Sequence, residues 1–357
     1  STLTAPIRHQ AAARPLKNNE REGWIVMKRR QLLGGMAAAG VGMALGAHEA
    51  LAGAPPPGTF TASDVHVQDY PTVQAIHWIG DQLAKETEGR LSLRVYHSGQ
   101  IGRENDTIDL TRYGALDFTR VNFAALTNIF PVSGVLTLPY VFDDTAHMRR
   151  ALDGAVGKDL LAAMSQRGLV AACFYDSGAR CIYNGRRPVH EPRDLHGMKI
   201  RVPLSDIFMS MTQAMGANPT PLSFGEVFTA LQTHLIDGAE NNWPSLDSTR
   251  QFEVAHHWAE THHSMSPELL FISERSLRAL TKNDRDLVLD LAARSVAVMR
   301  ELWDKDEAAA KAHCVANGVQ ISEVDKDAFR LATEPVLKAY LANPDIQQFY
   351  RRIRQEA

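Results

Sequence analysis

The stretch of residues 198–243 constrains the fold of this chain more than any other part of the sequence. Residues 198–202 alternate apolar and basic side chains, which is typical of a strand with one buried face. Pro203 ends that strand, because proline has no backbone N–H to donate to a neighbouring strand. Residues 235–239 return to a strand that runs into the polar sequence ENN at 240–242. We predict a βαβ unit, and such parallel strands open into ligand crevices at their carboxyl ends.

Two helices are expected between these strands. The first follows Ser205 or Asp206, either of which can cap it, and stops at Gly216, a residue that suits the left-handed position just past a helix end. Residues 218–221, with the sequence NPTP, then form a short extended link. The S-x-x-E spacing at 223–226 is that of a capping box and starts the second helix.

Helix and strand patterns alternate along the rest of the chain after about residue 60. Strands are expected at 65–67, 91–95, 116–121 and 169–175, and helices at 72–87, 104–113 and 283–317. This alternation predicts an α/β fold built on parallel strands. With 357 residues and 45% hydrophobic content, the chain is long enough for two domains, each with its own core.

An export signal is expected within residues 1–52. A basic run at 28–30 follows Met27, a Leu-, Gly- and Ala-rich run extends to Ala47, and the sequence ALA at 50–52 has the small-x-small pattern of a cleavage site. The twin arginine in the basic run is a partial match to the twin-arginine export route. A short buried helix is the alternative. Residues 1–26 precede a credible initiator methionine, and no fold is assigned to them.

The mature chain is expected to be acidic. Of 38 basic and 41 acidic side chains, seven and three lie before residue 53, so a net charge of about −7 remains. No basic stripe with interleaved aromatic residues survives, which disfavours a nucleic-acid partner. An anionic ligand would therefore have to be held by a few local arginines, because the overall field repels it.

Strings in three segments of the chain connect this sequence to a known family. The chain carries KIRVP, NPTP, EVFTALQT and IDGAENN in register within the βαβ unit, together with FYDSGARCIYN and VYHSGQIGRENDTIDLTRYGALDF. These strings closely resemble the extracytoplasmic solute-binding proteins of tripartite ATP-independent periplasmic (TRAP) transporters. The likeness covers nearly all of the chain after about Thr61.

The resemblance implies an α/β, two-lobed periplasmic-binding-protein-like fold with a long bracing helix. Residues 62–177 plus 267–306 are expected to form lobe I, and 178–266 plus 307–357 lobe II, after the upstream segment at 1–52. The chain would cross between lobes after residue 175 and return near 267–272. It would be a periplasmic monomer that takes a small organic acid to membrane permease subunits of a TRAP transporter, with no cofactor.

Two arginines are the main candidates for holding the acid. A guanidinium matches a carboxylate with two parallel hydrogen bonds and stays charged when water is expelled. Arg201 falls on the arginine of the family's KIRVP-like motif, which clamps the substrate carboxylate. Arg180 falls on the second family arginine and would add a bond to the carboxylate or to an adjacent hydroxyl. The alternative for Arg201 is an ordinary solvated surface charge.

Further ligand contacts are implied at family positions. Asn241 matches a polar residue of the IDGAENN turn, and an amide that both donates and accepts suits a hydroxyl. Phe224 occupies the place of an aromatic wall, although simple packing is an equal alternative. The remaining candidates are Asn242, Arg120, Asn122, Asp206, Glu104 and His97, for which loop polarity is the alternative to ligand contact.

The number of hydroxyl-directed groups favours a polyhydroxylated monoacid over a plain C4 dicarboxylate. The strings YDSGAR, SDIF and GAENNWPS further resemble the branch of the family that takes up hexuronates such as glucuronate or galacturonate. Leu204 departs from the asparagine of several relatives, so that contact is absent or moves to Ser205 or Asp206. A C4-dicarboxylate or 2-oxo acid binding protein and an exported enzyme remain the alternatives.

Other site types are disfavoured by spacing. The sequence HHWAETHH at 256–263 looks like metal spacing, but its histidine pairs would point to different faces of a helix, and no cysteine or glutamate completes a zinc site. Cys173 and Cys181 have a spacing that allows a bridge, although a buried free thiol in an apolar strand is favoured for Cys173. Cys314 leaves an odd count. No Walker loop, dinucleotide fingerprint or nucleophile elbow is present.

Overall fold

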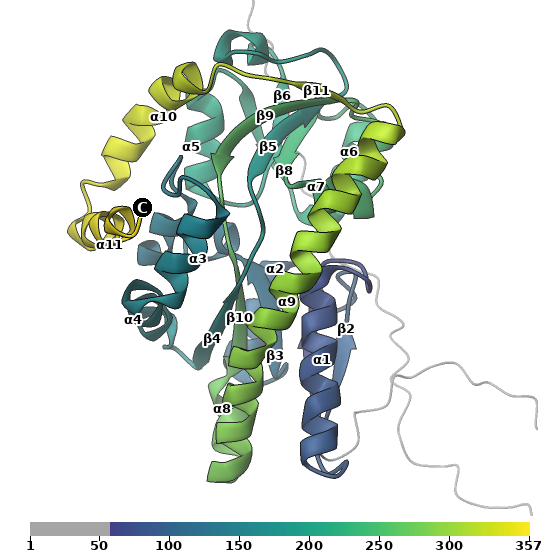
Figure 1. The fold of residues 1–357 in the computed structure, drawn as a ribbon, viewed down its shortest axis with the longest axis vertical. Coiled ribbons are helices and arrows are strands. Elements are labelled where there is room, and N and C mark those ends of the chain that lie inside the picture. Colours follow the sequence, from purple (N-terminus) through teal and green to yellow (C-terminus); the bar gives the residue numbers. More distant parts are fainter. Residues whose placement is uncertain (1–57) are drawn as a thin grey trace, which may run out of the picture. The chain divides into compact units, whose positions relative to one another are not determined.

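Two β-sheets organise the chain in the computed structural model, which describes residues 58–357 (Figure 1). The predicted export signal lies outside the described residues. No helix within 58–357 is long and apolar enough to cross a membrane. Each sheet is the centre of one lobe, and we call these the first and the second lobe in chain order.

The first lobe contains a five-stranded sheet in the order β2-β1-β3-β10-β4. Strands β1, β2 and β3 run parallel, whereas β10 is antiparallel to both of its neighbours. The strands are β1 Thr59–Ser63, β2 Ser92–Tyr96, β3 Phe118–Asn122, β4 Leu169–Tyr175 and β10 Glu268–Ser273. The helices that follow or flank them are α1 Pro71–Glu86, α2 Glu104–Tyr113, α3 Thr145–Asp153, α4 Ala155–Met164 and α8 Glu274–Arg278.

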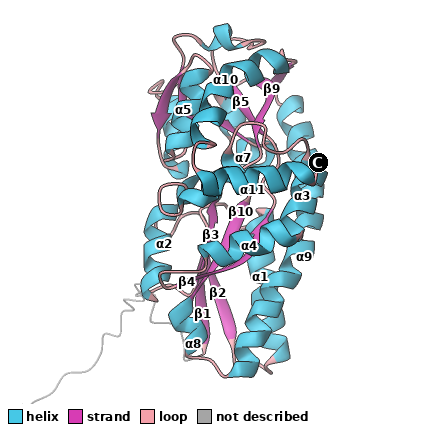
Figure 2. Ribbon diagram, turned by 90° about the vertical axis from the view of Figure 1, so that its left-hand side faces the viewer, coloured by secondary structure: helices cyan, strands magenta, loops and turns pink. Residues whose placement is uncertain are grey.

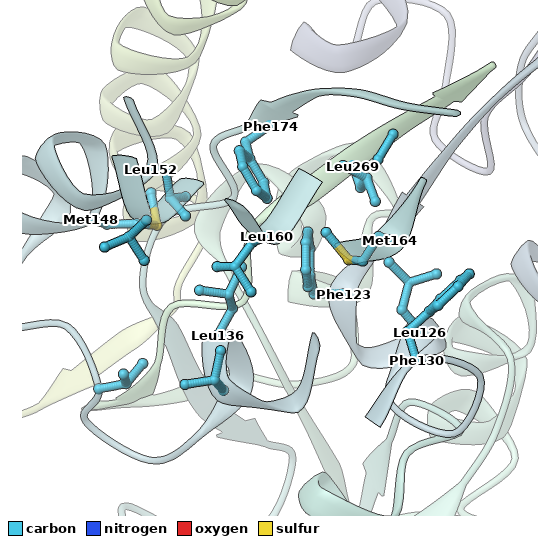
Figure 3. Packing of buried hydrophobic residues seen from close by; sticks show 14 of the residues in the cluster. Phe123, Leu126, Phe130, Leu136, Met148, Leu152, Leu160, Met164, Phe174 and Leu269 are labelled. Carbon is cyan, nitrogen blue, oxygen red and sulfur yellow. The ribbon is translucent and has the colours of Figure 1, made fainter. Parts of the chain in front are cut away.

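Helices cover both faces of this sheet (Figure 2). On one face, α1 buries its predicted stripe, Val73, Ile76, Ile79 and Leu83. The opposite face carries a second cluster, to which α2, α3 and α4 contribute. Figure 3 shows part of that cluster, in which the Phe123 and Phe174 rings stack at 5.6 Å between centroids. Because successive strand residues point to opposite faces, one set of strands supplies both cores.

The second lobe contains a six-stranded sheet in the order β11-β9-β5-β8-β6-β7. The strands are β5 Arg180–Asn184, β6 Lys199–Val202, β7 Asn218–Pro221, β8 Gly238–Asn241, β9 His257–Ser264 and β11 Gln320–Ser322. The helices are α5 Asp206–Ala214, α6 Val227–Gln232, α7 Trp243–Ser248 and α10 Lys326–Tyr340. Strands β6 and β8 pair in parallel, as the predicted βαβ unit requires. The Ser223–Glu226 capping box is also present.

Two short segments join the two sheets. Strand β4 of the first sheet leads through residues 176–179 to β5 of the second, and residues 265–267 lead from β9 back to β10. Helix α9, Lys282–Ala316, packs against α1 of the first lobe and α7 of the second (Figure 1). The two-lobed α/β fold with a long bracing helix is therefore confirmed.

Three local predictions are wrong. The first strand is β1 at 59–63, because at 65–67 the Asp64 carboxylate accepts the His66 backbone N–H and turns the chain. The NPTP segment is an edge strand, β7, and not a link, since proline is tolerated where no partner strand needs its N–H. The histidine-rich segment forms strand β9 instead of a helix, paired with β5 and β11.

The assignment of residue ranges to lobes stays a prediction. Helix α11, Pro344–Gln355, contributes Ile346 and Ile353 to a hydrophobic cluster of the first lobe, whereas α10 packs against α5 and β9 of the second. We therefore propose that the chain crosses between lobes once more near residue 341, so that α11 belongs with lobe I.

Candidate functional site

A cleft between the lobes lies at the carboxyl ends of β3, β6 and β8. Its outer part has a volume of about 350 Å³ and its inner part of about 30 Å³. The outer volume is in the range of small-molecule pockets, about 300–1,000 Å³. The inner part has room for only two or three water molecules, at about 10–15 Å³ each. A ligand of several carbon atoms therefore fits the inner part only after the lobes move apart.

Both lobes supply the walls of the cleft. The inner part is lined by Val65, His66, Glu104, Arg120, Asn122, Arg180, Arg201, Pro203, Phe224, Asn241 and Glu268. The outer part shares Val65, Glu104, Arg201, Pro203 and Phe224 with it, so the two parts are continuous. These five residues line the cleft at both depths.

Arg180, the first residue of β5, is held by a buried carboxylate. Its Nε and one terminal nitrogen donate to Glu240 at 2.6 and 2.8 Å, and its other terminal nitrogen donates to the Asn241 amide oxygen at 3.1 Å. Burial alone would lower the pKa of Arg180, but the Glu240 carboxylate reverses this and raises it. The same pairing lowers the pKa of Glu240 against the effect of its own burial. The charge of Arg180 is therefore already neutralised within the protein.

Arg201, on β6, is different because no carboxylate of the described residues lies within ion-pair distance of it. Its Nε and one terminal nitrogen donate to the Leu222 carbonyl at 2.9 and 2.7 Å, which fixes the plane of the guanidinium. The side chain is buried, and burial lowers its pKa. A guanidinium nevertheless stays protonated in proteins. Arg201 is thus a positioned cation without an internal counter-charge, at the wall of the cleft.

Arg120, on β3, is surrounded by carboxylates of the first lobe. Its Nε donates to Asp64 at 2.9 Å, and one terminal nitrogen donates to Glu104 at 3.0 Å and to Glu268 at 2.5 Å. Its other terminal nitrogen contacts Asp64 and the His66 ring. All of its nitrogens therefore have acceptors inside the protein.

Glu104, the first residue of α2, lines both parts of the cleft. Burial raises its pKa to about 7, with Glu268 adding repulsion and Arg120 opposing the shift. One of its oxygens accepts from Arg120 and from the Asn122 backbone N–H at 2.8 Å. The carboxyl group is therefore partly protonated near neutral pH.

Aromatic rings complete the wall. Phe224 of the second lobe lies 4.9 Å from the His66 ring of the first, centroid to centroid, and His66 stacks on Tyr70 at 3.8 Å. Burial and the Arg120 charge lower the pKa of His66, so its ring is neutral at physiological pH. This contact presents apolar surface across the mouth of the inner part.

Seven of the ten predicted ligand contacts come together at the cleft. They are Arg180, Arg201, Asn241, Arg120, Asn122, Phe224 and Glu104. Asn122 is largely engaged by the chain that returns to the first lobe, since its amide nitrogen donates to the Ser266 carbonyl and to Glu268. Their roles toward a ligand stay predictions.

The other three lie elsewhere. Asn242 is buried outside the cleft, where its side chain caps α7 and donates to the Ser177 carbonyl at 2.8 Å. Asp206 is exposed at the start of α5, on the side that faces Tyr340. His97 contacts its neighbour Ser98. Ser205 bonds to Thr127 across the lobes instead of capping α5, while Leu204 lines the outer part.

Apart from Glu104, sequence reasoning missed the acidic side chains of the site. Glu240 and Glu268 are buried in strands, and Asp64 lies just after β1. In the sequence, Asp64 and Glu268 are 56 and 148 residues away from Arg120, so no local sequence spacing indicates that they contact it. The available signal was charge in otherwise apolar strands, because a charge is rarely buried without a partner.

No group of three or more metal-ligating side chains occurs within residues 58–357. The three cysteines are buried free thiols, in β4, β5 and α9. Burial raises the pKa of Cys173 to about 12, which keeps its thiol protonated.

A two-lobed α/β fold with a ligand-sized cleft between lobes, walled by buried arginines, defines a periplasmic-type solute-binding protein. Residues 62–343 match the family described as bacterial extracellular solute-binding protein, family 7 (DctP), and the chain belongs to this family. It is therefore an extracytoplasmic solute-binding protein of the TRAP type.

Individual relatives agree with this assignment. A "Solute-binding protein" of Chromohalobacter salexigens is 35% identical over 293 residues, which are 82% of this chain and 87% of that protein. A TRAP periplasmic solute-binding protein from a Bradyrhizobium species, in complex with D-galacturonate, has 46% identity and a TM-score of 0.81 over 83% of this chain and 99% of its own. One from Roseobacter denitrificans, with bound β-D-glucuronate, has 39% identity and a TM-score of 0.80 over 83% and 98%.

Proposed function

We propose that this protein captures a hexuronate, such as D-galacturonate or D-glucuronate, in the cleft between its lobes. The observation that carries the proposal is Arg201, the one cleft arginine of the described residues without a carboxylate partner. A buried, charged and pre-oriented guanidinium favours a carboxylate ligand. The structural neighbours that hold galacturonate and glucuronate support a sugar acid.

Each wall residue has a task that follows from its contacts. Arg201 holds the carboxylate with the donors that Leu222 leaves free. Asn241 is fixed through its oxygen by Arg180, so its amide nitrogen is turned to a ligand oxygen. Phe224 packs its apolar ring against the C–H face of the sugar ring. Arg180 acts by positioning Asn241 and adds little net charge.

The choice between a sugar acid and a dicarboxylate rests on acceptors in the first lobe. Arg120 was expected to serve hydroxyl groups, but its donors are taken by Asp64, Glu104 and Glu268. The first-lobe wall therefore presents carboxylate oxygens to a ligand, and these accept hydrogen bonds from hydroxyl groups. A C4 dicarboxylate or 2-oxo acid would have few donors to give them.

Members of this family bind small organic acids and work with TRAP permeases, and we infer the same partner for this chain. We further infer that it acts as a monomer and binds its ligand without transforming it. The prominent cleft residues are arginines and amides, which bind a ligand but are not nucleophiles. Turnover of a uronate by the purified protein would contradict this inference.

A thermal-shift screen tests the proposed ligand class. A ligand that binds only the folded state raises the melting temperature, by an amount that grows with the logarithm of the ligand concentration relative to the dissociation constant. Galacturonate and glucuronate should shift it by several degrees, whereas succinate, malate and pyruvate should not. A larger shift with a dicarboxylate or 2-oxo acid than with either uronate would overturn the proposal.

A further inference from the structure

The two walls of the inner part of the cleft carry opposite net charge. On the second-lobe wall, Arg180 is balanced by Glu240, which leaves Arg201 as one surplus positive charge. On the first-lobe wall, a single arginine faces three carboxylates. The inner part of the cleft therefore has a positive wall on the second lobe and a negative wall on the first. A ligand that bridges it meets a cation at one end and anions at the other.

Among those three carboxylates, Glu104 is the one in reach of a ligand. Asp64 lies behind Arg120 and is fully buried, and both Glu268 oxygens are used, by Arg120 and by the Asn122 amide. Glu104 is 18% exposed and lines both parts of the cleft. Its Oε1 takes both internal hydrogen bonds, so Oε2 remains as an acceptor toward the cleft.

We propose that Glu104 is the specificity-determining residue that selects a monoanionic, hydroxyl-bearing acid and rejects a second anionic group at the first-lobe end of the cleft. The inference rests on the proposed function and extends it from a ligand class to a ligand orientation. The carboxylate of the sugar acid faces Arg201, and the hydroxyls at the far end of the ring donate to Glu104.

Charge accounts for the selectivity in both directions. A hydroxyl gives Glu104 a charge-assisted hydrogen bond, which is stronger than a neutral one. A second carboxylate at the same place would meet the uncompensated negative charge of the whole wall, and like charges brought together at a desolvated interface are strongly unfavourable. A sugar diacid of the same carbon number is therefore the discriminating ligand.

The ionisation of Glu104 gives a second readout. The charged and titratable groups that face it are Arg120 from β3, Glu268 from β10, Asp64 and His66 from the turn after β1, and Arg201 from the second lobe. Ionised Glu104 is the better acceptor for a hydroxyl. Because burial holds its pKa near neutrality, at about 7, galacturonate affinity should fall as the pH is lowered through that range. The ligand's own carboxyl, with a pKa of about 3.5, stays ionised throughout.

The test is calorimetry with D-galacturonate and with galactarate, the C6 diacid of the same configuration, on the wild type and on Glu104→Gln. Glu104→Gln should bind galacturonate about 10-fold more weakly, since a neutral acceptor replaces a charged one. The same variant should bind galactarate more tightly than the wild type does. Opposite shifts for the two ligands cannot come from a loss of folded protein.

The pH profile completes the test. The wild-type affinity for galacturonate should decrease between about pH 8 and pH 5.5, and the Glu104→Gln profile should be flat. Glu274→Gln is the matched control, because Glu274 is the first residue of helix α8 and lies outside the cleft. It should show wild-type binding of both ligands.

Three results would overturn the inference. They are unchanged galacturonate affinity in Glu104→Gln, galactarate binding to that variant no tighter than to the wild type, and a pH profile shared by the two proteins. If the wild type binds neither galacturonate nor glucuronate, the proposed function itself is wrong. That outcome is separate from the other three, since it needs no variant.

Discussion

At the residue scale, the second lobe contains a buried ion pair between Arg180 and Glu240. Both side chains are at most 4% exposed. Glu240→Gln leaves a buried guanidinium without a counter-charge, and breaking a buried pair in this way costs about 3–5 kcal/mol of the unfolding free energy. Urea denaturation measures the change. Glu301→Gln, which removes one partner of the exposed Lys305 pair, is the control and should leave the midpoint unchanged.

The pKa of Glu104 makes a second residue-scale prediction. Folding raises this pKa from 4.5 to about 7 because the carboxyl is buried. The folded protein therefore binds the proton more strongly than the unfolded chain, and the carboxyl destabilises the fold increasingly as pH rises through that interval. Glu104→Gln removes the effect. Relative to the wild type, its unfolding free energy in urea should increase from about pH 5 to pH 8, and a constant difference would show that the pKa is ordinary.

At the element scale, the segment that leads from β4 to β5 depends on Gly178. Its φ of +60° is left-handed, and a Cβ there would lie 2.5 Å from a Glu307 oxygen and 3.0 Å from the Trp303 ring. Gly178→Ala should cost about 1–2 kcal/mol of unfolding free energy, from backbone strain together with displacement of α9 side chains. Gly197→Ala has a similar φ of +78° and open space around it. Thermal unfolding should therefore show a larger loss for Gly178→Ala, and equal losses would mean that the contact with α9 contributes nothing.

Local patterns predicted most elements, since they are set by nearby residues. The stripe of α1, the capping box at 223–226 and the length of α9 all follow from helical spacing within the segment itself. The errors arose where a distant partner decides. Residues 65–67 look like a strand by composition, yet Asp64 is drawn into the Arg120 cluster and the chain turns there.

The residues of the site were predicted less completely than the helices and strands. Arg180 and Arg201 were placed by the resemblance to the family, which carries information about a cleft that no single segment contains. It was not predictable that Arg180 has a carboxylate partner and Arg201 has none among the described residues. Glu240 lies 60 residues from Arg180, and only the fold brings the two together. Asn242 was misplaced for a similar reason. Its neighbour Asn241 ends β8 and lines the cleft, whereas Asn242 follows the strand, caps α7 and donates to the Ser177 carbonyl.

At the scale of the whole molecule, the narrow inner cleft implies movement of the lobes. With about 30 Å³ between Arg180 and Arg120, a sugar acid enters only if the two lobes separate, and it then favours the closed state by bridging them. Small-angle scattering should give a smaller radius of gyration with saturating galacturonate than without ligand. An unchanged radius at saturation, with binding verified in the same sample, would contradict closure.

The most direct measurement is calorimetric titration of galacturonate into the wild type, Arg201→Ala and Arg201→Lys, with Arg330→Ala, an arginine of α10 outside the cleft, as the control. Removing a desolvated, charge-paired contact costs about 2–5 kcal/mol, so Arg201→Ala should lose roughly 30-fold or more in affinity. Arg201→Lys should recover only part of it, because an ammonium lacks the planar fork, and Arg330→Ala should bind as the wild type does. Wild-type affinity in Arg201→Ala would contradict the claim that this cation holds the ligand's carboxylate.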